Sequence, residues 1–136
     1  MAFAASRPFA TPPSLADIEA MAREAYAGIP DSLRRHCDGV VIRVVDFPDD
    51  EIMEAMDCET PFDLLGLYQG VDLTRRSVSD NPDDLDIIYL YRRPLLDYWC
   101  ETEEHLMNVV RHVLIHEIGH HFGFSDDDMD HIEAQA

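Results

Sequence analysis

Apolar residues at helical spacing dominate the stretch between Thr102 and Phe122. They are Leu106, Val109, Val110, Val113, Leu114, Ile115 and Ile118. Because these positions cover most of the circumference of a helix, the stretch predicts a helix from Thr102 to about Phe122 that is largely buried. Any fold of this chain must therefore enclose this helix.

The rest of the chain predicts a mixture of helices and strands. Ser14 and Asp17 match a capping box at a helix start, and Pro48 and Pro94 end two segments rich in β-branched or aromatic residues. In chain order, the predicted elements are a helix over 15–27, a strand over 39–47, a short helix over 49–56, an irregular stretch over 61–84, a strand over 86–94, the long helix and a short final helix.

Composition sets limits on size, partners and compartment. The 136 residues, 46% of them apolar, predict one domain over 14–136 behind a flexible tail over 1–13. A formal charge of -18 disfavours nucleic acid and membrane surfaces as partners. The three cysteines form no CxxC pair, and no membrane span or secretory signal is recognised, so a reducing cytoplasm is expected. The oligomeric state stays open, a homodimer included.

The long helix ends in the sequence HEIGHHFGFSDDD, residues 116–128. His116 and His120 are four positions apart, so their imidazole rings share one helix face and can converge on one ion. Glu117 projects from a neighbouring position, within reach of a water on that ion. Zinc suits such donors, because it accepts imidazole nitrogen and carboxylate oxygen in tetrahedral geometry.

A third zinc ligand must come from beyond these two histidines. Gly123 permits a sharp reversal that can bring Asp126 back beneath them, which gives the pattern HExxHxxGxxD. In a shuffled chain of this composition the pattern is expected roughly 0.0002 times. The sequence therefore predicts one Zn²⁺ ion held by His116, His120 and Asp126.

Each residue of this pattern also has a structural explanation. The two histidines could be buried side chains bonded to carbonyls, and Glu117 a paired structural acid. Asp126 could cap the final helix, although its spacing from the histidines favours a ligand. The alternative third ligands are Asp127, Asp128, His131 and Glu133.

Two further histidines flank the pair on the same helix. His112 lies about 12 Å along the axis from His120, too far for both rings to bind one ion. His121 points away from the pair and is predicted either to be structural or to support the metal ligands without binding the ion.

The motif resembles that of small zincin-type metallopeptidases, specifically the minimal single-domain Asp-zincins of bacteria. The segments LLGLYQGVDLTRR, 64–76, and IYLYRRPL, 88–95, are also similar to middle segments of that family, so the resemblance covers most of the chain after about residue 14. It implies a compact α+β mini-zincin, in which a small twisted sheet packs against the HExxH helix beside an N-terminal and a short C-terminal helix. It also implies that His116, His120 and Asp126 are metal ligands and Glu117 the general base.

The predicted activity is hydrolysis of peptide bonds in a peptide or unfolded polypeptide, by a metal-activated water with Glu117 as general base. The alternative is a non-catalytic zinc-binding regulatory or interaction domain, since only 13 residues follow Gly123 and leave no second subdomain. An acidic interaction module whose metal is incidental ranks last.

The sequence gives less on how a substrate is held. The strand over 86–91 is expected to offer a free edge to an extended peptide. Side chains able to stabilise an oxyanion are Tyr68, Tyr89, Tyr91, Arg92 and Arg93, with none preferred.

Overall fold

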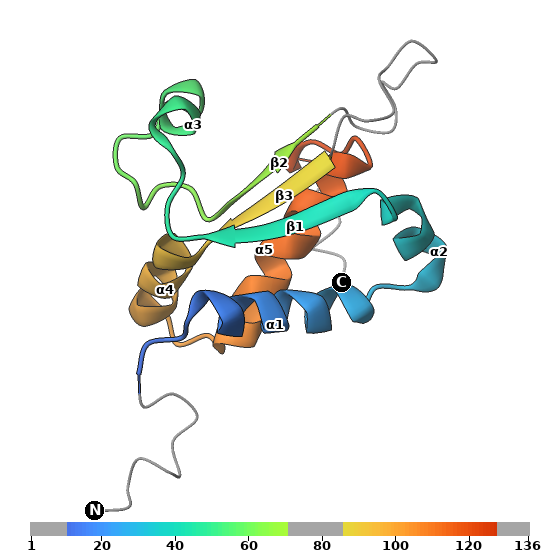
Figure 1. The fold of residues 1–136 in the computed structure, drawn as a ribbon, viewed down its shortest axis with the longest axis horizontal. Coiled ribbons are helices and arrows are strands. Elements are labelled where there is room, and N and C mark those ends of the chain that lie inside the picture. The colour runs from blue at the N-terminus through green and yellow to red at the C-terminus, as the bar shows by residue number, and fades with distance from the viewer. Residues whose placement is uncertain (1–10, 71–85, 128–136) are drawn as a thin grey trace, which may run out of the picture.

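The structure is a computed structural model that describes residues 11–70 and 86–127 (Figure 1). Its strands are β1 (Val40–Val45), β2 (Gly66–Gln69) and β3 (Asp86–Tyr91). Its helices are α1 (Leu15–Ala27), α2 (Asp31–Arg34), α3 (Asp50–Ala55), α4 (Arg92–Glu101) and α5 (Leu106–His121), with a 3₁₀ turn at Arg35–Cys37. Within these residues the chain is therefore a mixed α/β domain of five helices and a small three-stranded sheet, which confirms the predicted fold class.

The three strands form one mixed sheet in the order β1-β3-β2. β3 pairs parallel with β1, in the register Ile42↔Ile88, and antiparallel with β2, in the register Tyr68↔Ile88. The prediction that 86–91 offers a free edge is therefore wrong, because this strand has a partner on both sides. β3 takes the central position because Ile88 and Leu90 are fully buried, whereas the short, glycine-containing β2 suits an edge.

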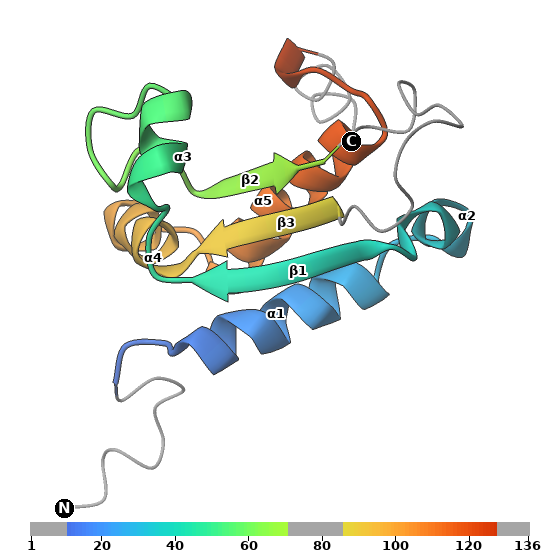
Figure 2. The same cartoon turned by 45° about the horizontal axis from the view of Figure 1, so that its top comes forward.

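Helices α1 and α5 lie together against one face of the sheet (Figures 1 and 2). The fully buried residues of the core between them include Ile18 and Ala22 of α1, Ile88 and Leu90 of β3, and Val110 and Leu114 of α5. Burial of each large aliphatic side chain contributes about 1.5–3 kcal/mol. The predicted burial of the long helix is thus confirmed, although Ile115 on its outer side stays 38% exposed.

Helix α1 begins and ends as the sequence predicts. The Ser14 hydroxyl accepts a hydrogen bond from the Asp17 N–H at 3.1 Å, and the Asp17 carboxylate accepts from the Ser14 N–H at 2.8 Å. Pro13, the last residue of the predicted tail, is buried, and its carbonyl accepts from Nε of Arg92 at 2.6 Å. Residues 1–10 of that tail lie outside the described residues.

The segment before α5 differs from its prediction. LLDYWC, residues 95–100, lies between the predicted strand and the predicted long helix but belongs to α4, and α5 begins at Leu106 rather than at Thr102. Pro94 does not end the strand but lies in the first turn of α4, where its missing N–H costs no helical hydrogen bond. Of the irregular stretch, β2 is described and 71–84 is not. None of the described helices has the length and apolarity needed to cross a bilayer.

Candidate metal centre

The last two turns of α5 carry His116 and His120 on one face. Their ring centroids lie 4.9 Å apart, with the ring planes at 80°. Both side chains are half-buried, at 23% and 28% exposure, so each ring is held by its surroundings while one edge stays open. The spacing of four residues therefore places the rings as the sequence predicts.

A tight reversal follows α5 and is built around Gly123. This glycine has a φ of 92°, which falls in the left-handed region that other residues rarely adopt. Its N–H donates to the His120 carbonyl at 3.0 Å, and the Phe124 N–H donates to the Gly119 carbonyl at 2.9 Å, the pattern of a Schellman cap. The chain therefore turns back along the helix instead of continuing past it.

The reversal brings the Asp126 carboxylate to the two imidazoles. Its Oδ1 atom lies 2.8 Å from Nε2 of His116 and 3.0 Å from Nε2 of His120. One donor atom from each of the three side chains falls within 4.8 Å of the others. Asp126 is the first residue of a helical turn, with Ser125 before it, and the rest of the predicted final helix lies outside the described residues.

The donor set fits a zinc ion. Nδ1 of His120 lies 2.9 Å from the carbonyl oxygen of Phe124, which can only accept, so Nδ1 carries hydrogen. In the neutral ring, Nε2 then turns its lone pair toward the Asp126 carboxylate. Two lone pairs facing each other at 3.0 Å repel unless a proton or a cation lies between them. Ligand atoms bound to tetrahedral zinc are about 3.4 Å apart, so an ion requires the Asp126 oxygen to move only about half an ångström away from each imidazole nitrogen.

The electrostatics of Asp126 also favour a cation. The hydrogen bond from His116 is the main cause that lowers the pKa of Asp126, and the charges of His120 and His116 add to it. Its side chain is 77% exposed, so the carboxylate is ionised and open to solvent on its outer side. An ion can therefore reach the three side chains without unfolding the domain.

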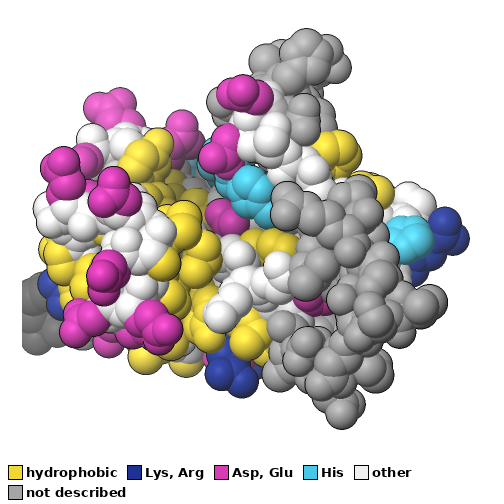
Figure 3. Space-filling model, turned by 90° about the horizontal axis from the view of Figure 1, so that it is seen from above, with side chains coloured by type: hydrophobic (Ala, Val, Ile, Leu, Met, Phe, Trp, Pro, Cys, Tyr) yellow, Lys and Arg dark blue, Asp and Glu magenta, His cyan; other side chains and the backbone are white. Residues whose placement is uncertain are grey.

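Glu117 lies in the same cavity as the three donors. The cavity has a volume of about 630 Å³, and histidines and acids meet in its hollow (Figure 3). Glu117 is only 8% exposed. Burial raises the pKa of Glu117, against the lowering effects of His120, His116 and a hydrogen bond from the Tyr68 N–H. A buried carboxyl with a raised pKa next to an ion site is well placed to exchange protons.

Strand β2 forms the opposite wall of this cavity. The Tyr91 N–H donates to the Leu65 carbonyl at 3.0 Å, so the alternation of an antiparallel ladder turns the backbone groups of Gly66 and Tyr68 away from β3. The outward N–H of Tyr68 is the group that meets Glu117. A Cβ at position 66 would come within 2.7 Å of Val113 Cγ1, so glycine is what allows α5 to approach β2 this closely.

Comparison with known proteins identifies the family. The sequence model of the zincin-like metallopeptidases matches residues 37–136 of the chain. The chain belongs to the zincin-like metallopeptidase family. No curated protein matches it in a sequence search. All of the zincin-like cavity described above, from β2 to Asp126, falls in the matched region, and membership implies zinc binding and peptide substrates.

His121 of this zincin-like domain has a different role from His120, as the sequence predicts. It is 2% exposed. Its Nδ1 lies 3.0 Å from the Tyr68 hydroxyl, its Nε2 lies 2.9 Å from the His36 carbonyl, and the same hydroxyl donates to Asp86 at 3.1 Å. These bonds fasten the end of α5 to β2, β3 and the turn before β1.

The other candidate ligands in the described part of the chain do not join the zincin-like cluster. The ring centroid of His112 is 6.5 Å from that of His116, and no donor atom of His112 belongs to the group of three. Asp127 is exposed and also stays apart from it. Asp128, His131 and Glu133 lie outside the described residues.

Of the five suggested oxyanion donors, Tyr68 lines the cavity, and its hydroxyl bonds to Asp86 and His121. Arg92 pairs instead with Asp46 at 3.0 Å, and Arg93 lies over the Phe47 ring. The rings of Tyr89 and Tyr91 stack on each other, with their centroids 6.1 Å apart, and neither residue lines the cavity.

Sequence reasoning missed the contribution of the β2 backbone. Gly66 and the N–H of Tyr68 both shape the cavity, yet they lie in the stretch that was interpreted as irregular. A glycine inside a short apolar run, as in LLGLYQG, is a signal of close backbone approach and could have indicated this wall.

Proposed function

We propose that this protein is a zinc-dependent metallopeptidase in which His116, His120 and Asp126 hold one zinc ion and Glu117 is the general base. The observation that carries the proposal is the convergence of three donor atoms within 4.8 Å, beside a buried carboxylate in the same cavity. Bound there, zinc would act as a Lewis acid that polarises the peptide carbonyl and lowers the pKa of water.

Glu117 would accept a proton from the attacking water and deliver it to the leaving amine. Burial raises the pKa of this carboxyl toward the range in which a group can both take and return a proton near neutral pH. The Tyr68 N–H holds the carboxylate from the β2 side. Glu117 is thus oriented by the strand wall and not only by its own helix.

Asp126 gives the site a distinct charge balance. An anionic third ligand lowers the net charge of a zinc site from +2 to +1, so water there is less acidic than in a site with three histidines. The proton-accepting role of Glu117 is therefore expected to matter more, and its loss to be more costly.

We propose that the peptide substrate lies along the outer side of β2. Among the described residues β2 pairs on one side only, with β3. Gly66 turns its N–H and carbonyl away from β3 and lines the cavity, so an extended peptide can pair with it beside Glu117. We therefore propose β-augmentation at β2, instead of at the strand over 86–91 that the sequence suggested.

The decisive experiment compares wild type with Glu117→Ala. Both are purified without a histidine tag, assayed for zinc by elemental analysis, and incubated with an unfolded polypeptide and a peptide library. We expect one zinc per chain in both proteins and a loss of about 10²- to 10⁴-fold in cleavage rate for the variant.

Two outcomes would contradict this proposal in different ways. Equal cleavage by the variant would remove Glu117 as the base. Zinc binding by wild type without cleavage of any peptide would favour the non-catalytic zinc-binding domain instead.

A further inference from the structure

A second cavity lies beside α5, nearer the start of that helix than the metal centre. It has a volume of about 520 Å³ and is lined by Leu65, Tyr98, Glu104, Asn108, Val109, His112 and Val113. The two cavities have neighbouring walls. Gly66, which lines the first, is adjacent in sequence to Leu65, which lines the second, and a Cβ at position 66 would lie 2.7 Å from Val113 Cγ1, also in the second. Val113 is one helical turn from Glu117, about 6 Å along the axis.

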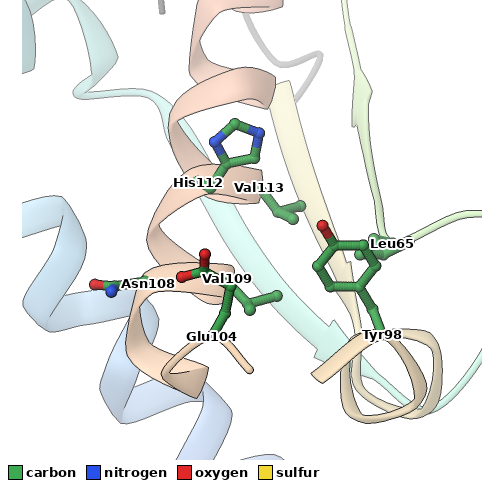
Figure 4. Close-up of a pocket in the computed structure, with 7 residues that line it drawn as sticks. All are labelled: Leu65, Tyr98, Glu104, Asn108, Val109, His112 and Val113. Carbon is green, nitrogen blue, oxygen red and sulfur yellow. The ribbon is translucent and has the colours of Figure 1, made fainter. Parts of the chain in front are cut away.

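The lining of this cavity is divided into an apolar wall and a polar end. Figure 4 shows Val109 and Val113 projecting from α5 toward Leu65 and the ring of Tyr98. Glu104, in the loop just before α5, is the one acid among the described residues that line the cavity, and none of these residues is a lysine or an arginine. Arg111 of α5 donates to the Asn108 side chain at 3.2 Å and lines a different cavity.

Such a lining matches a side chain with an apolar stem and a cationic tip. Lysine and arginine bury their methylene stems along apolar surface while keeping the charged group in a polar setting. Here Val109, Val113 and Leu65 would contact the stem, and Glu104 would meet the charge. An acidic side chain in the same place would face the Glu104 carboxylate.

The direction of β2 determines which substrate residue reaches this cavity. β2 runs alongside α5 in the same direction, since Gly66 contacts Val113 while Tyr68 bonds to His121, two turns later. A peptide that pairs antiparallel with β2, the commoner arrangement, therefore runs toward Leu65 with its carboxyl end. The residue just after the cleaved bond would then point into the second cavity.

We propose that this cavity selects substrates with lysine or arginine immediately after the cleaved bond, through Glu104. This inference rests on the proposed function and extends it to a class of substrate. Glu104 is a specificity residue: it is exposed, lies outside α5, and contacts neither the candidate ligands nor Glu117.

The test uses three peptides that differ at one position only, carrying lysine, norleucine or glutamate after the cleaved bond. Norleucine keeps an apolar stem and removes the charge. For wild type we expect kcat/KM to be about 2- to 5-fold higher for lysine than for norleucine, as an exposed ion pair contributes. Glu104→Lys should reverse the order and favour glutamate.

Glu103→Lys is the matched control, because Glu103 is also exposed and adjacent but does not line the cavity. Both substitutions replace -1 by +1 and move the formal charge from -18 to -16, so both alter long-range attraction equally. Glu103→Lys is therefore expected to keep the wild-type preference. An equal reversal by both variants would show that overall charge, not the cavity, sets the preference and would overturn the inference.

Binding measured without turnover separates this inference from the proposed function. Affinities of the zinc-loaded Glu117→Ala protein for the three peptides, with and without Glu104→Lys, give the ranking directly. The expected ranking, reversed by Glu104→Lys, supports the cavity even if wild type cleaves nothing. Equal affinities, or no binding of any peptide, would overturn it even if wild type is an active peptidase.

Discussion

Replacement of Asp126 by alanine tests the metal centre through the thermal stability of the protein. A ligand that binds only the folded state at 100 times its Kd stabilises that state by about 2.7 kcal/mol. An unfolding entropy of about 2.1 cal/mol/K per residue gives about 0.29 kcal/mol/K for 136 residues. Wild type at that zinc concentration should therefore melt about 9 °C above the metal-free protein.

Asp126→Ala should lose most of this zinc-dependent shift. Loss of even an outer contact to a metal costs about 10- to 100-fold in affinity, so loss of a direct ligand should cost at least the upper figure. At the same zinc concentration the shift then falls to about 1–2 °C. The metal-free variant should melt close to metal-free wild type, because the Asp126 side chain is 77% exposed and its ion pairs are weak.

The assay is differential scanning calorimetry with buffered free zinc, and Asp127→Ala is the control. Asp127 is the neighbouring acid, exposed and outside the cluster, so its removal should leave the zinc shift intact. A wild-type shift that survives Asp126→Ala unchanged would refute the assignment of this carboxylate as a ligand. If both variants lost the zinc-dependent shift equally, the shift would depend on the overall negative charge of this segment and not on a specific ligand.

Three other substitutions test the packing and electrostatics of the site and of the core around it. Gly66→Ala should destabilise the protein by roughly 1–3 kcal/mol in denaturant unfolding, because its Cβ would lie 2.7 Å from Val113 Cγ1; an unchanged midpoint would contradict the close approach. Tyr91→Phe should raise the melting temperature by several degrees, since the Tyr91 hydroxyl is buried without a hydrogen-bond partner in the described chain; a lower one would reveal a hidden partner. Glu117→Gln should stabilise the metal-free protein on the order of 1 kcal/mol at neutral pH. Burial raises the folded-state pKa of Glu117, so wild type loses stability as pH rises from the ordinary carboxyl range through the raised pKa. The difference in melting temperature between Glu117→Gln and wild type should therefore grow over that pH range. A constant difference would contradict the burial effect.

The sequence was most informative where chemistry is local. Ser14 and Asp17 specify the start of α1 through their own side chains. The spacing of His116, His120 and Asp126, with Gly123 between, is sufficient to predict that the three meet, because one helix and one cap determine their positions. Each of these interactions spans at most ten residues, so no knowledge of the tertiary fold is needed.

Strand order could not be predicted in this way. The apolar pattern of β3 fits a central or an edge strand, and only its pairing with both β1 and β2 distinguishes the two. The same limit hid the contact between the Tyr68 N–H and Glu117, which joins groups far apart in the chain. The start of α4 was obscured by Pro94, whose effect on a helix depends on whether it falls in the first turn.

The cap at Gly123 also determines how much of the backbone would become more mobile if a bound ion were lost. A cation bridging His116 and Asp126 would close a loop of about ten residues, so the chain entropy that it restrains is small and confined to the end of α5. Chelation should therefore increase amide hydrogen exchange mainly between Phe122 and Asp127, and leave β3 and the first turns of α5 protected. Metal loss would release this one turn of backbone and spare the rest of the domain.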